Sequence, residues 1–126
     1  NIAKICNPVL DTGWQYERCI DGVFLVNISQ MNLETDRVND FCNNVPNQLK
    51  VTCVENTITR LIEVDWDNIE KAVAFCTNTD SGFIIDACYT QLVYESTFAL
   101  IPGSKEFFSL CEALPSQYKV QCLAKI

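Results

Sequence analysis

Apolar residues recur at the spacing of an α-helix in several separate segments of the chain. The most regular stripe consists of Leu49, Cys53, Val54, Ile58, Leu61 and Ile62. Similar stripes run through residues 20–28 and 84–93, and each fits one face of an amphipathic helix of about four turns. No segment alternates convincingly between apolar and polar residues, so the pattern predicts helices and no strands.

A shorter helix is expected before each long one, with a start signal of its own. Residues 67–70 (Asp-Asn-Ile-Glu) have the form of a capping box, and residues 102–104 (Pro-Gly-Ser) precede another apolar segment. Thr35 or Asp36 can cap a third short helix. The expected turns between short and long helices contain Gly13, Pro46, Gly82 and Pro115, and proline suits the first position of the helix that follows. Each unit therefore reads helix, tight turn, helix.

The eight cysteines repeat along the chain with a nearly constant period. Gaps between successive cysteines alternate between a short one of 11 to 13 positions and a long one of 23. Every second cysteine is therefore 34 to 36 positions from the next, and this period holds over four units, which indicates an internal repeat. Within one domain, 1–126, the units are approximately 1–31, 32–64, 65–100 and 101–126.

The short gap places two cysteines on either side of each predicted turn. Residues at similar distances from the turn of a helical hairpin face each other, and a disulfide can join them when their α-carbons lie within about 7 Å. Zinc ligands usually lie two to four positions apart, whereas no two cysteines here are closer than 11, so no metal site is expected. The predicted disulfides are Cys6–Cys19, Cys42–Cys53, Cys76–Cys88 and Cys111–Cys122.

Four disulfide-stapled helical hairpins with this period resemble the tetratricopeptide and Sel1-like repeat proteins, and among them the secreted Helicobacter cysteine-rich proteins. The resemblance covers the whole chain and rests on the period, the hairpin and the bridge. This chain has only 4 Gly and wider cysteine spacing, whereas those families carry small residues at fixed positions. The resemblance implies an all-α stack of four units, as a short solenoid or a compact bundle, and implies no particular activity.

The charge balance narrows the range of partners. With 9 Lys and Arg against 16 Asp and Glu, the net charge is −7, and no basic cluster is present. Nucleic acids and anionic membranes both require a basic surface, so neither is an expected partner. The longest uninterrupted apolar run covers residues 23–26, far short of the roughly 20 residues of a membrane span.

The cysteine content indicates an oxidising compartment. Eight cysteines, an even number, in a short chain are typical of secreted proteins. The chain begins at Asn1, as expected for a mature protein after removal of a signal peptide, and Asn27-Ile28-Ser29 is a sequon that makes Asn27 a candidate glycosylation site. We therefore expect a secreted protein.

Few residues suggest catalysis. The chain has no histidine, so no Ser/His or Cys/His pair exists. Carboxylate pairs such as Asp65 with Asp67, or Asp36 with Asp40, could in principle act as an acid pair, as in glycosidases. Negative charge at a helix start is the better interpretation of the first pair. The sequence predicts a protein that is not an enzyme and has no cofactor.

Assembly is the leading hypothesis for function. The ends of the predicted array carry apolar residues where repeat arrays usually have polar caps. The candidate assembly residues are Ile2, Ile5, Leu123 and Ile126. Complementary open ends favour head-to-tail contact between copies, so we expect an extracellular structural protein that forms a filament or surface layer.

The alternative hypothesis is a secreted monomeric binding module, either a carrier of an apolar ligand or an inhibitor of another extracellular protein. Aromatic residues would then line a cavity, although they suit an ordinary core equally well. The candidates are Phe24, Phe75, Phe83, Phe98, Phe107 and Phe108. Trp14 and Trp66 lie near helix starts and are either exposed binding residues or part of the turn packing, with packing favoured.

Overall fold

The computed structural model describes residues 6, 14–31, 34–79 and 82–126, and these residues form helices and no strand. The α-helices are α2 (Trp14–Gln30), α3 (Thr35–Asn43), α4 (Lys50–Val64), α5 (Ile69–Thr77), α6 (Gly82–Phe98), α7 (Lys105–Ala113) and α8 (Ser116–Leu123). Two short 3₁₀ helices, η2 (Asn47–Leu49) and η3 (Trp66–Asn68), precede α4 and α5. The all-α prediction is confirmed.

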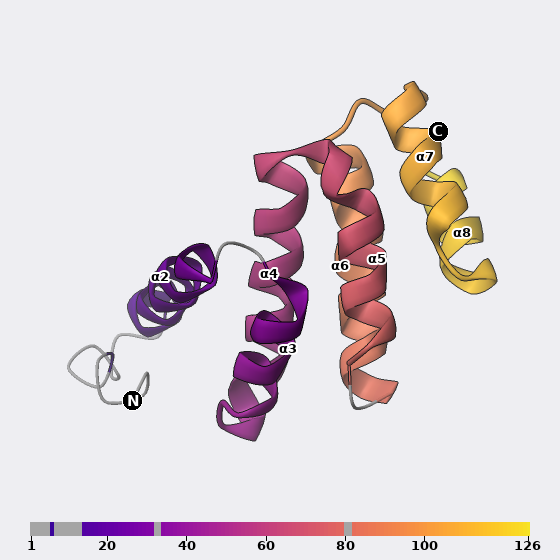
Figure 1. Ribbon diagram of the computed structural model, residues 1–126. Coiled ribbons are helices and arrows are strands. Elements are labelled where there is room, and N and C mark those ends of the chain that lie inside the picture. Colours follow the sequence, from indigo (N-terminus) through magenta and orange to yellow (C-terminus); the bar gives the residue numbers. More distant parts are fainter. Residues whose placement is uncertain (1–5, 7–13, 32–33, 80–81) are drawn as a thin grey trace.

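From α3 to α8, each α-helix contacts the next one along the chain (Figure 1). The long helix α4 packs between α2 and α6, and α6 also contacts α8. The short helix α5 contacts both α3 and α7, and each short helix packs on the long helix that follows it. These contacts are the ones expected of stacked helical hairpins. Whether the stack forms a solenoid or a compact bundle was left open by the sequence and stays open.

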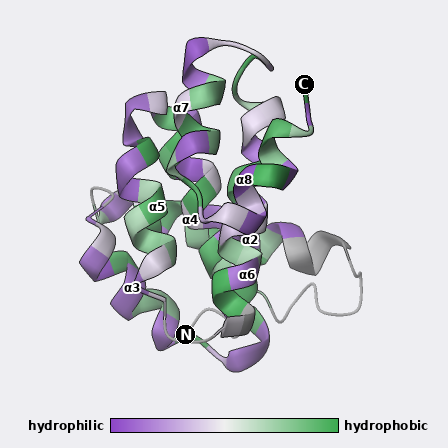
Figure 2. Ribbon diagram, turned by 90° about the vertical axis from the view of Figure 1, so that its right-hand side faces the viewer, coloured by the Kyte–Doolittle hydropathy of each residue, from purple (hydrophilic) through white to green (hydrophobic). Residues whose placement is uncertain are grey.

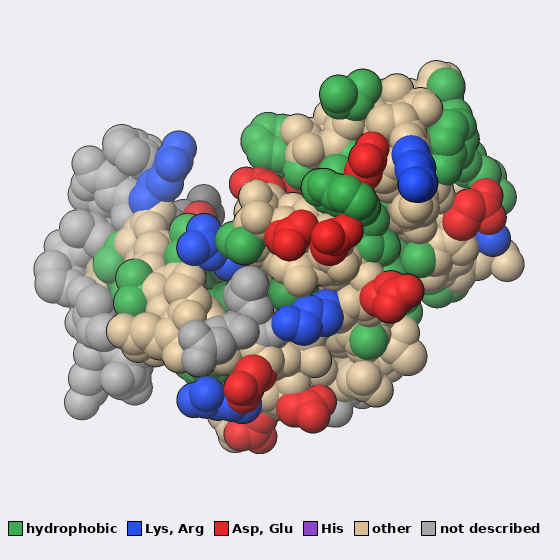
Figure 3. Space-filling model, turned by 45° about the horizontal axis from the view of Figure 1, so that its top comes forward, with side chains coloured by type: hydrophobic (Ala, Val, Ile, Leu, Met, Phe, Trp, Pro, Cys, Tyr) green, Lys and Arg blue, Asp and Glu red, His purple; other side chains and the backbone are tan. Residues whose placement is uncertain are grey.

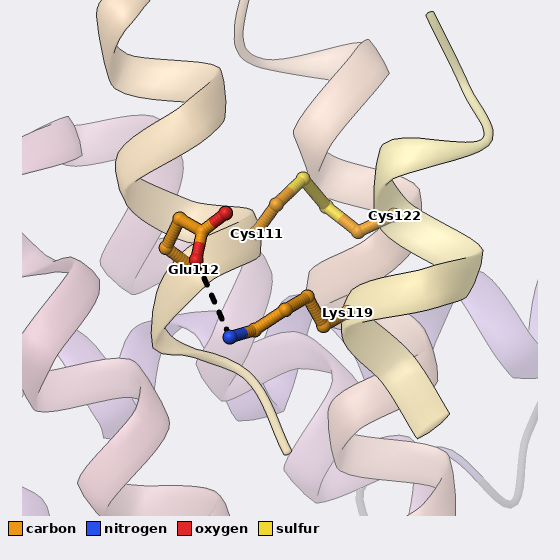
Figure 4. A network of polar contacts seen from close by, with 4 residues as sticks. All are labelled: Cys111, Glu112, Lys119 and Cys122. Carbon is orange, nitrogen blue, oxygen red and sulfur yellow. Dashed lines mark ion pairs between the residues drawn. A yellow bond between two sulfur atoms is a disulfide. The ribbon is translucent and has the colours of Figure 1, made fainter. Parts of the chain in front are cut away.

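All four predicted disulfides are present. Their Cα–Cα distances are 5.4 to 5.7 Å, within the usual range for a disulfide. Three of them join α3 to α4, α5 to α6 and α7 to α8, and the fourth joins Cys6 to α2. Figure 4 shows the bridge between α7 and α8, beside which Lys119 Nζ lies 3.3 Å from Glu112 Oε2.

The helix starts agree only partly with the sequence signals. Ser104 caps α7 as expected, because its hydroxyl accepts a hydrogen bond from the Phe107 amide (3.1 Å). The preceding Gly103 has a φ of 83°, a left-handed conformation that suits glycine. The capping box at residues 67–70 is wrong, because α5 begins only at Ile69 and Asp65 instead caps η3.

Two other start signals are displaced by one position. Glu34 precedes the first residue of α3, and neither Thr35 nor Asp36 caps it through a side chain. Pro46 and Pro115 also stand just before the first helical residue, rather than at it. In both places the helix begins where the backbone leaves the extended conformation.

The core lies along the seams between the helices. Phe24, Phe75 and Phe107 are fully buried there, together with seven of the eight half-cystines. Figure 2 shows hydrophobic residues concentrated on the inner sides of the helices and hydrophilic residues on outer faces. Burial of these aromatic rings supplies much of the folding free energy.

Polar side chains also connect consecutive long helices. Asn56 in α4 donates a hydrogen bond to Asp21 in α2 (3.0 Å), 35 positions earlier in the chain. The Tyr118 hydroxyl in α8 donates to Asp86 in α6 (2.6 Å), 32 positions earlier. These two bonds link α2 to α4 and α6 to α8.

Candidate binding cleft between α4 and α6

A cleft of about 420 Å³ lies where α4 and α6 end, and residues 62–66 and 98–100 line it. This volume is within the range of ligand-binding pockets in proteins. One wall comes from the last turn of α4 and the start of η3, and the other from the end of α6.

The turn between α4 and η3 determines the shape of the first wall. Asp65 is extended (φ −160°, ψ 116°), which ends α4, and its Oδ1 accepts a hydrogen bond from the Asp67 amide (3.0 Å). Asn68 then donates to the Leu61 carbonyl (2.9 Å), which ties η3 back to α4. Trp66, at the start of η3, is thereby held at the cleft.

The cleft exposes large apolar side chains. Val64, Trp66 and Phe98 line it and are 50, 46 and 62 % exposed. Tyr94 lies one turn before Phe98, and their rings stack with centroids 5.3 Å apart. We call Trp66, Tyr94 and Phe98 the aromatic strip. Contiguous exposed apolar groups of this kind are a feature of interaction sites.

Acidic side chains accompany the apolar ones. Glu63 and Asp65 line the same cleft and are both exposed. In Figure 3, which brings the top of Figure 1 forward, hydrophobic side chains lie beside Asp and Glu side chains. The cleft therefore presents aromatic rings and negative charge together.

A buried carboxylate, Glu95, lies next to the cleft in α6. It is 1 % exposed, and its Oε1 accepts hydrogen bonds from Thr59 Oγ1 and Gln91 Nε2, each 3.3 Å. Its other oxygen, Oε2, has no hydrogen-bond partner among the described residues. Burial, and next the proximity of Glu63, raise the pKa of Glu95 to about 7.

A second pair of acids lies between α2 and α4. Burial and the nearby Asp21 carboxylate raise the pKa of Glu55 above its usual value. Two carboxylates thus lie close together between α2 and α4, and another two between α4 and α6.

A second cleft, of about 520 Å³, lies between α6 and α8, and Tyr94, Gln121 and Lys125 are among its lining residues. The stacked rings of Tyr94 and Phe98 place the aromatic strip between the two clefts. The second cleft carries a lysine where the first carries two acids.

The predicted carboxylate pairs lie in different parts of the fold. Asp65 and Asp67 belong to the same turn, where Asp65 acts as a cap. Asp36 and Asp40 are exposed one turn apart on α3. Among the described residues there is no group of three or more His, Cys, Asp or Glu side chains suited to a metal ion.

The candidate phenylalanines do not surround a common cavity. Phe24, Phe75 and Phe107 belong to the core, whereas Phe98 lies in the cleft and Phe108 is 41 % exposed on α7. The side chains of Phe83 and Trp14 are outside the described residues. Trp66 is 46 % exposed at the start of η3, so it does not belong to the core.

The candidate assembly residues are only partly described. Ile2 and Ile5 lie outside the described residues, Leu123 is half-buried, and Ile126 is 69 % exposed. The candidate glycosylation site, Asn27, lies in α2, where its side-chain nitrogen donates to the Val23 carbonyl (2.8 Å).

Sequence reasoning overlooked Glu95. The signal was present, because Cys88, Leu92 and Glu95 follow the i, i+4, i+7 spacing of a buried helix face. A charged residue in such a stripe indicates either a buried polar contact or a functional group.

No protein-family model matches this chain, and no significant match exists among curated proteins or solved structures. In the part of the chain that the structure describes, no helix is both long enough and apolar enough to cross a bilayer. The class that the fold defines is an all-α, disulfide-stapled protein, and any function must be argued from its surface.

Proposed function

We propose that the protein is a secreted, non-enzymatic module that binds another extracellular protein in the cleft between α4 and α6. The observation that carries this proposal is the exposure of Val64, Trp66 and Phe98 around that cleft. Tryptophan and other aromatic residues in partly enclosed sites are common anchors of protein–protein binding.

The rigidity of the two walls supports the same proposal. Thr59 of α4 donates a hydrogen bond to Glu95 of α6 (3.3 Å) one turn before the cleft, and the two helices pack directly against each other. A cleft between helices that are already fixed loses little conformational entropy when a partner binds. The four disulfides also support secretion, because such bridges persist in oxidising compartments.

The placement of the carboxylates supports a binding role over catalysis. Glu95 is too deeply buried to meet a substrate in the cleft. One oxygen of Asp65 accepts the amide hydrogen of Asp67, which fixes this side chain as a helix cap.

A random dodecapeptide library displayed on phage tests the proposal. The library is panned on the full chain and depleted on a Trp66→Ala/Phe98→Ser variant, so that only cleft-dependent peptides remain. Phe108→Ser is the matched control, since Phe108 is exposed on α7, away from the cleft. Peptides that bind the wild type and this control, but not the double variant, are the expected result. Recovery of no such peptide would reject the proposal, provided that circular dichroism shows all variants folded.

Head-to-tail assembly is the second candidate function, and exposed apolar residues on the outermost helices favour it. Val26 on α2 is 57 % exposed and Val120 on α8 is 70 % exposed, at opposite ends of the row of helices in Figure 1. Light scattering and negative-stain microscopy over a range of concentrations test it. Fibres that Val120→Lys abolishes would support assembly, and a monomer at every concentration would exclude it.

A further inference from the structure

We infer that the cleft between α4 and α6 selects a basic segment of its protein partner, in which a Lys or Arg side chain lies next to an apolar anchor. This inference rests on the proposed function, because it names the chemistry of the partner that the cleft accepts. It is carried by the charges that line the cleft and by what happens to them when a partner covers it.

The charges in the cleft are all of one sign. Of the described residues that line it, Glu63 and Asp65 are the charged ones. The ion pairs found among the described residues are Arg37 with Glu34 and Lys119 with Glu112. Neither cleft carboxylate therefore has a basic partner within the part of the chain that the structure describes.

A covering partner must compensate for these charges. Removing a carboxylate from water is costly unless a cation or several hydrogen-bond donors replace the lost solvent. A wholly apolar partner would leave Glu63 and Asp65 desolvated and unpaired, and an acidic partner would add repulsion. A basic side chain would instead form charge-assisted hydrogen bonds with these carboxylates, which compensate for the water that they lose.

The buried carboxylate behind the cleft strengthens this preference. Glu95 Oε2 has no hydrogen-bond partner among the residues that the structure describes, although Glu95 is only 1 % exposed. When Glu95 is ionised, above about pH 7, its charge adds to that of the neighbouring Glu63. A cation beside Glu63 would relieve the repulsion between them.

The aromatic rings suit the rest of the same ligand. Trp66 and Phe98 offer apolar surface to the anchor residue and to the aliphatic stem of Lys or Arg. A guanidinium group can also stack on an aromatic face, which favours Arg over Lys. Rings and carboxylates in one cleft thus match both parts of a basic, apolar segment.

The peptides that the panning experiment retains test the inference. Their expected composition is a positive net charge, with Arg or Lys within two positions of an aromatic or aliphatic residue. Each peptide is then synthesised with every Arg and Lys replaced by Gln, and we expect its affinity by isothermal titration calorimetry to fall at least about tenfold.

A charge-matched pair of variants completes the test. The Glu63→Gln/Asp65→Asn variant should bind the basic peptides about tenfold more weakly than the wild type does. The Asp36→Asn/Asp40→Asn variant removes the same amount of charge from α3 and should leave the affinity unchanged. Cleft-dependent peptides without net positive charge, or equal weakening by both double variants, would overturn this inference while the proposed function stands. If no cleft-dependent peptide is retained, both fail.

Discussion

Glu95 in α6 accepts a hydrogen bond from the Thr59 hydroxyl in α4 at 3.3 Å, yet its second carboxylate oxygen is buried without a hydrogen-bond partner in the described part of the chain. The two long helices in the middle of the protein are therefore joined by a carboxylate that is only half satisfied. Glu63, one turn after Thr59 on α4, brings a second carboxylate close to it. This relationship makes the stability of the protein depend on pH.

We expect Glu95→Gln to remove part of that pH dependence. The pKa of Glu95 is raised from 4.5 to about 7, so the native state holds a proton that the unfolded state releases. The resulting stability is fully present below about pH 4.5 and is lost as the pH rises through about 7. The shift corresponds to roughly 3 kcal/mol of unfolding free energy.

Urea unfolding between pH 4.5 and pH 8.5 measures this effect. Relative to wild type, Glu95→Gln should gain stability between about pH 4.5 and pH 7, and the gain should level off toward pH 8.5. Asp40→Asn, at an exposed position on α3, is the control and should follow the wild-type profile. A wild type and a Glu95→Gln variant with parallel profiles would contradict the prediction.

Tyr118→Phe should destabilise the contact between α8 and α6. The Tyr118 hydroxyl donates to Asp86 at 2.6 Å, while the ring packs against Tyr89 with centroids 5.0 Å apart. The substitution keeps the ring and removes the hydrogen bond to a carboxylate, at a cost of about 2 kcal/mol. Tyr94→Phe, at an exposed position, should change stability by less than about 0.5 kcal/mol. Chemical unfolding with disulfides intact compares the two, and equal effects would show that the Asp86 bond is not stabilising.

Replacing both Cys111 and Cys122 by Ala should release α8 from the fold. This helix has eight residues, fewer than the roughly 12 to 15 that an isolated helix needs in water. The bridge closes a short loop worth about 3 kcal/mol in the chain-entropy model. Amide hydrogen exchange should become fast in α8 and stay slow in α4 and α6.

A milder variant separates the bridge from the ion pair beside it. Glu112→Gln removes the contact with Lys119, which is largely exposed and worth at most about 1 kcal/mol. Protection of α8 should survive this change. If Glu112→Gln releases α8 as completely as loss of the disulfide does, the ion pair rather than the bridge holds the helix.

Fluorescence quenching should reveal the negative charge of the cleft directly. The chain has two tryptophans, so Trp14→Phe leaves Trp66 as the only indole fluorophore. Glu63 and Asp65 lie in the same cleft as Trp66, so they should attract caesium ions and repel iodide ions. The ratio of caesium to iodide quenching of Trp66 should therefore be about twice the ratio for a neutral tryptophan amide.

Two further variants test the source of that difference. Adding Glu63→Gln and Asp65→Asn should bring the ratio of caesium to iodide quenching close to that of the neutral compound. Adding Asp36→Asn and Asp40→Asn should leave it unchanged. An unchanged ratio in the first case would show that the cleft carboxylates do not set the local potential.

The fold was largely predictable from the chain because its signals are local. Helical periodicity and the gaps of 11 to 13 positions between paired cysteines led to the helices and to all four disulfides. The exact starts were less predictable, since several polar residues compete for the cap. At the start of η3, Asp65 takes the role expected of Asp67 because the backbone is already extended at Asp65.

The cleft was much harder to predict because it depends on the relative positions of the ends of α4 and α6 in the folded protein. Trp66 and Phe98 are 32 positions apart, and nothing in either local segment shows that they face the same opening. Glu95 was detectable as an acid within an apolar stripe. The hydrogen bonds that it makes depend on the packing of α4 against α6, which the local sequence does not show. Packing between units therefore decides the candidate site.

The disulfides also determine how the molecule would respond to mechanical load. Each joins cysteines 11 to 13 positions apart, so tension applied at the two ends passes through the sulfur atoms and bypasses the turns between them. An unfolded stretch lengthens by about 3.6 Å per residue, but the bypassed residues contribute nothing while the bridges are intact. The maximum extension of this protein is thus controlled by the redox potential of its surroundings.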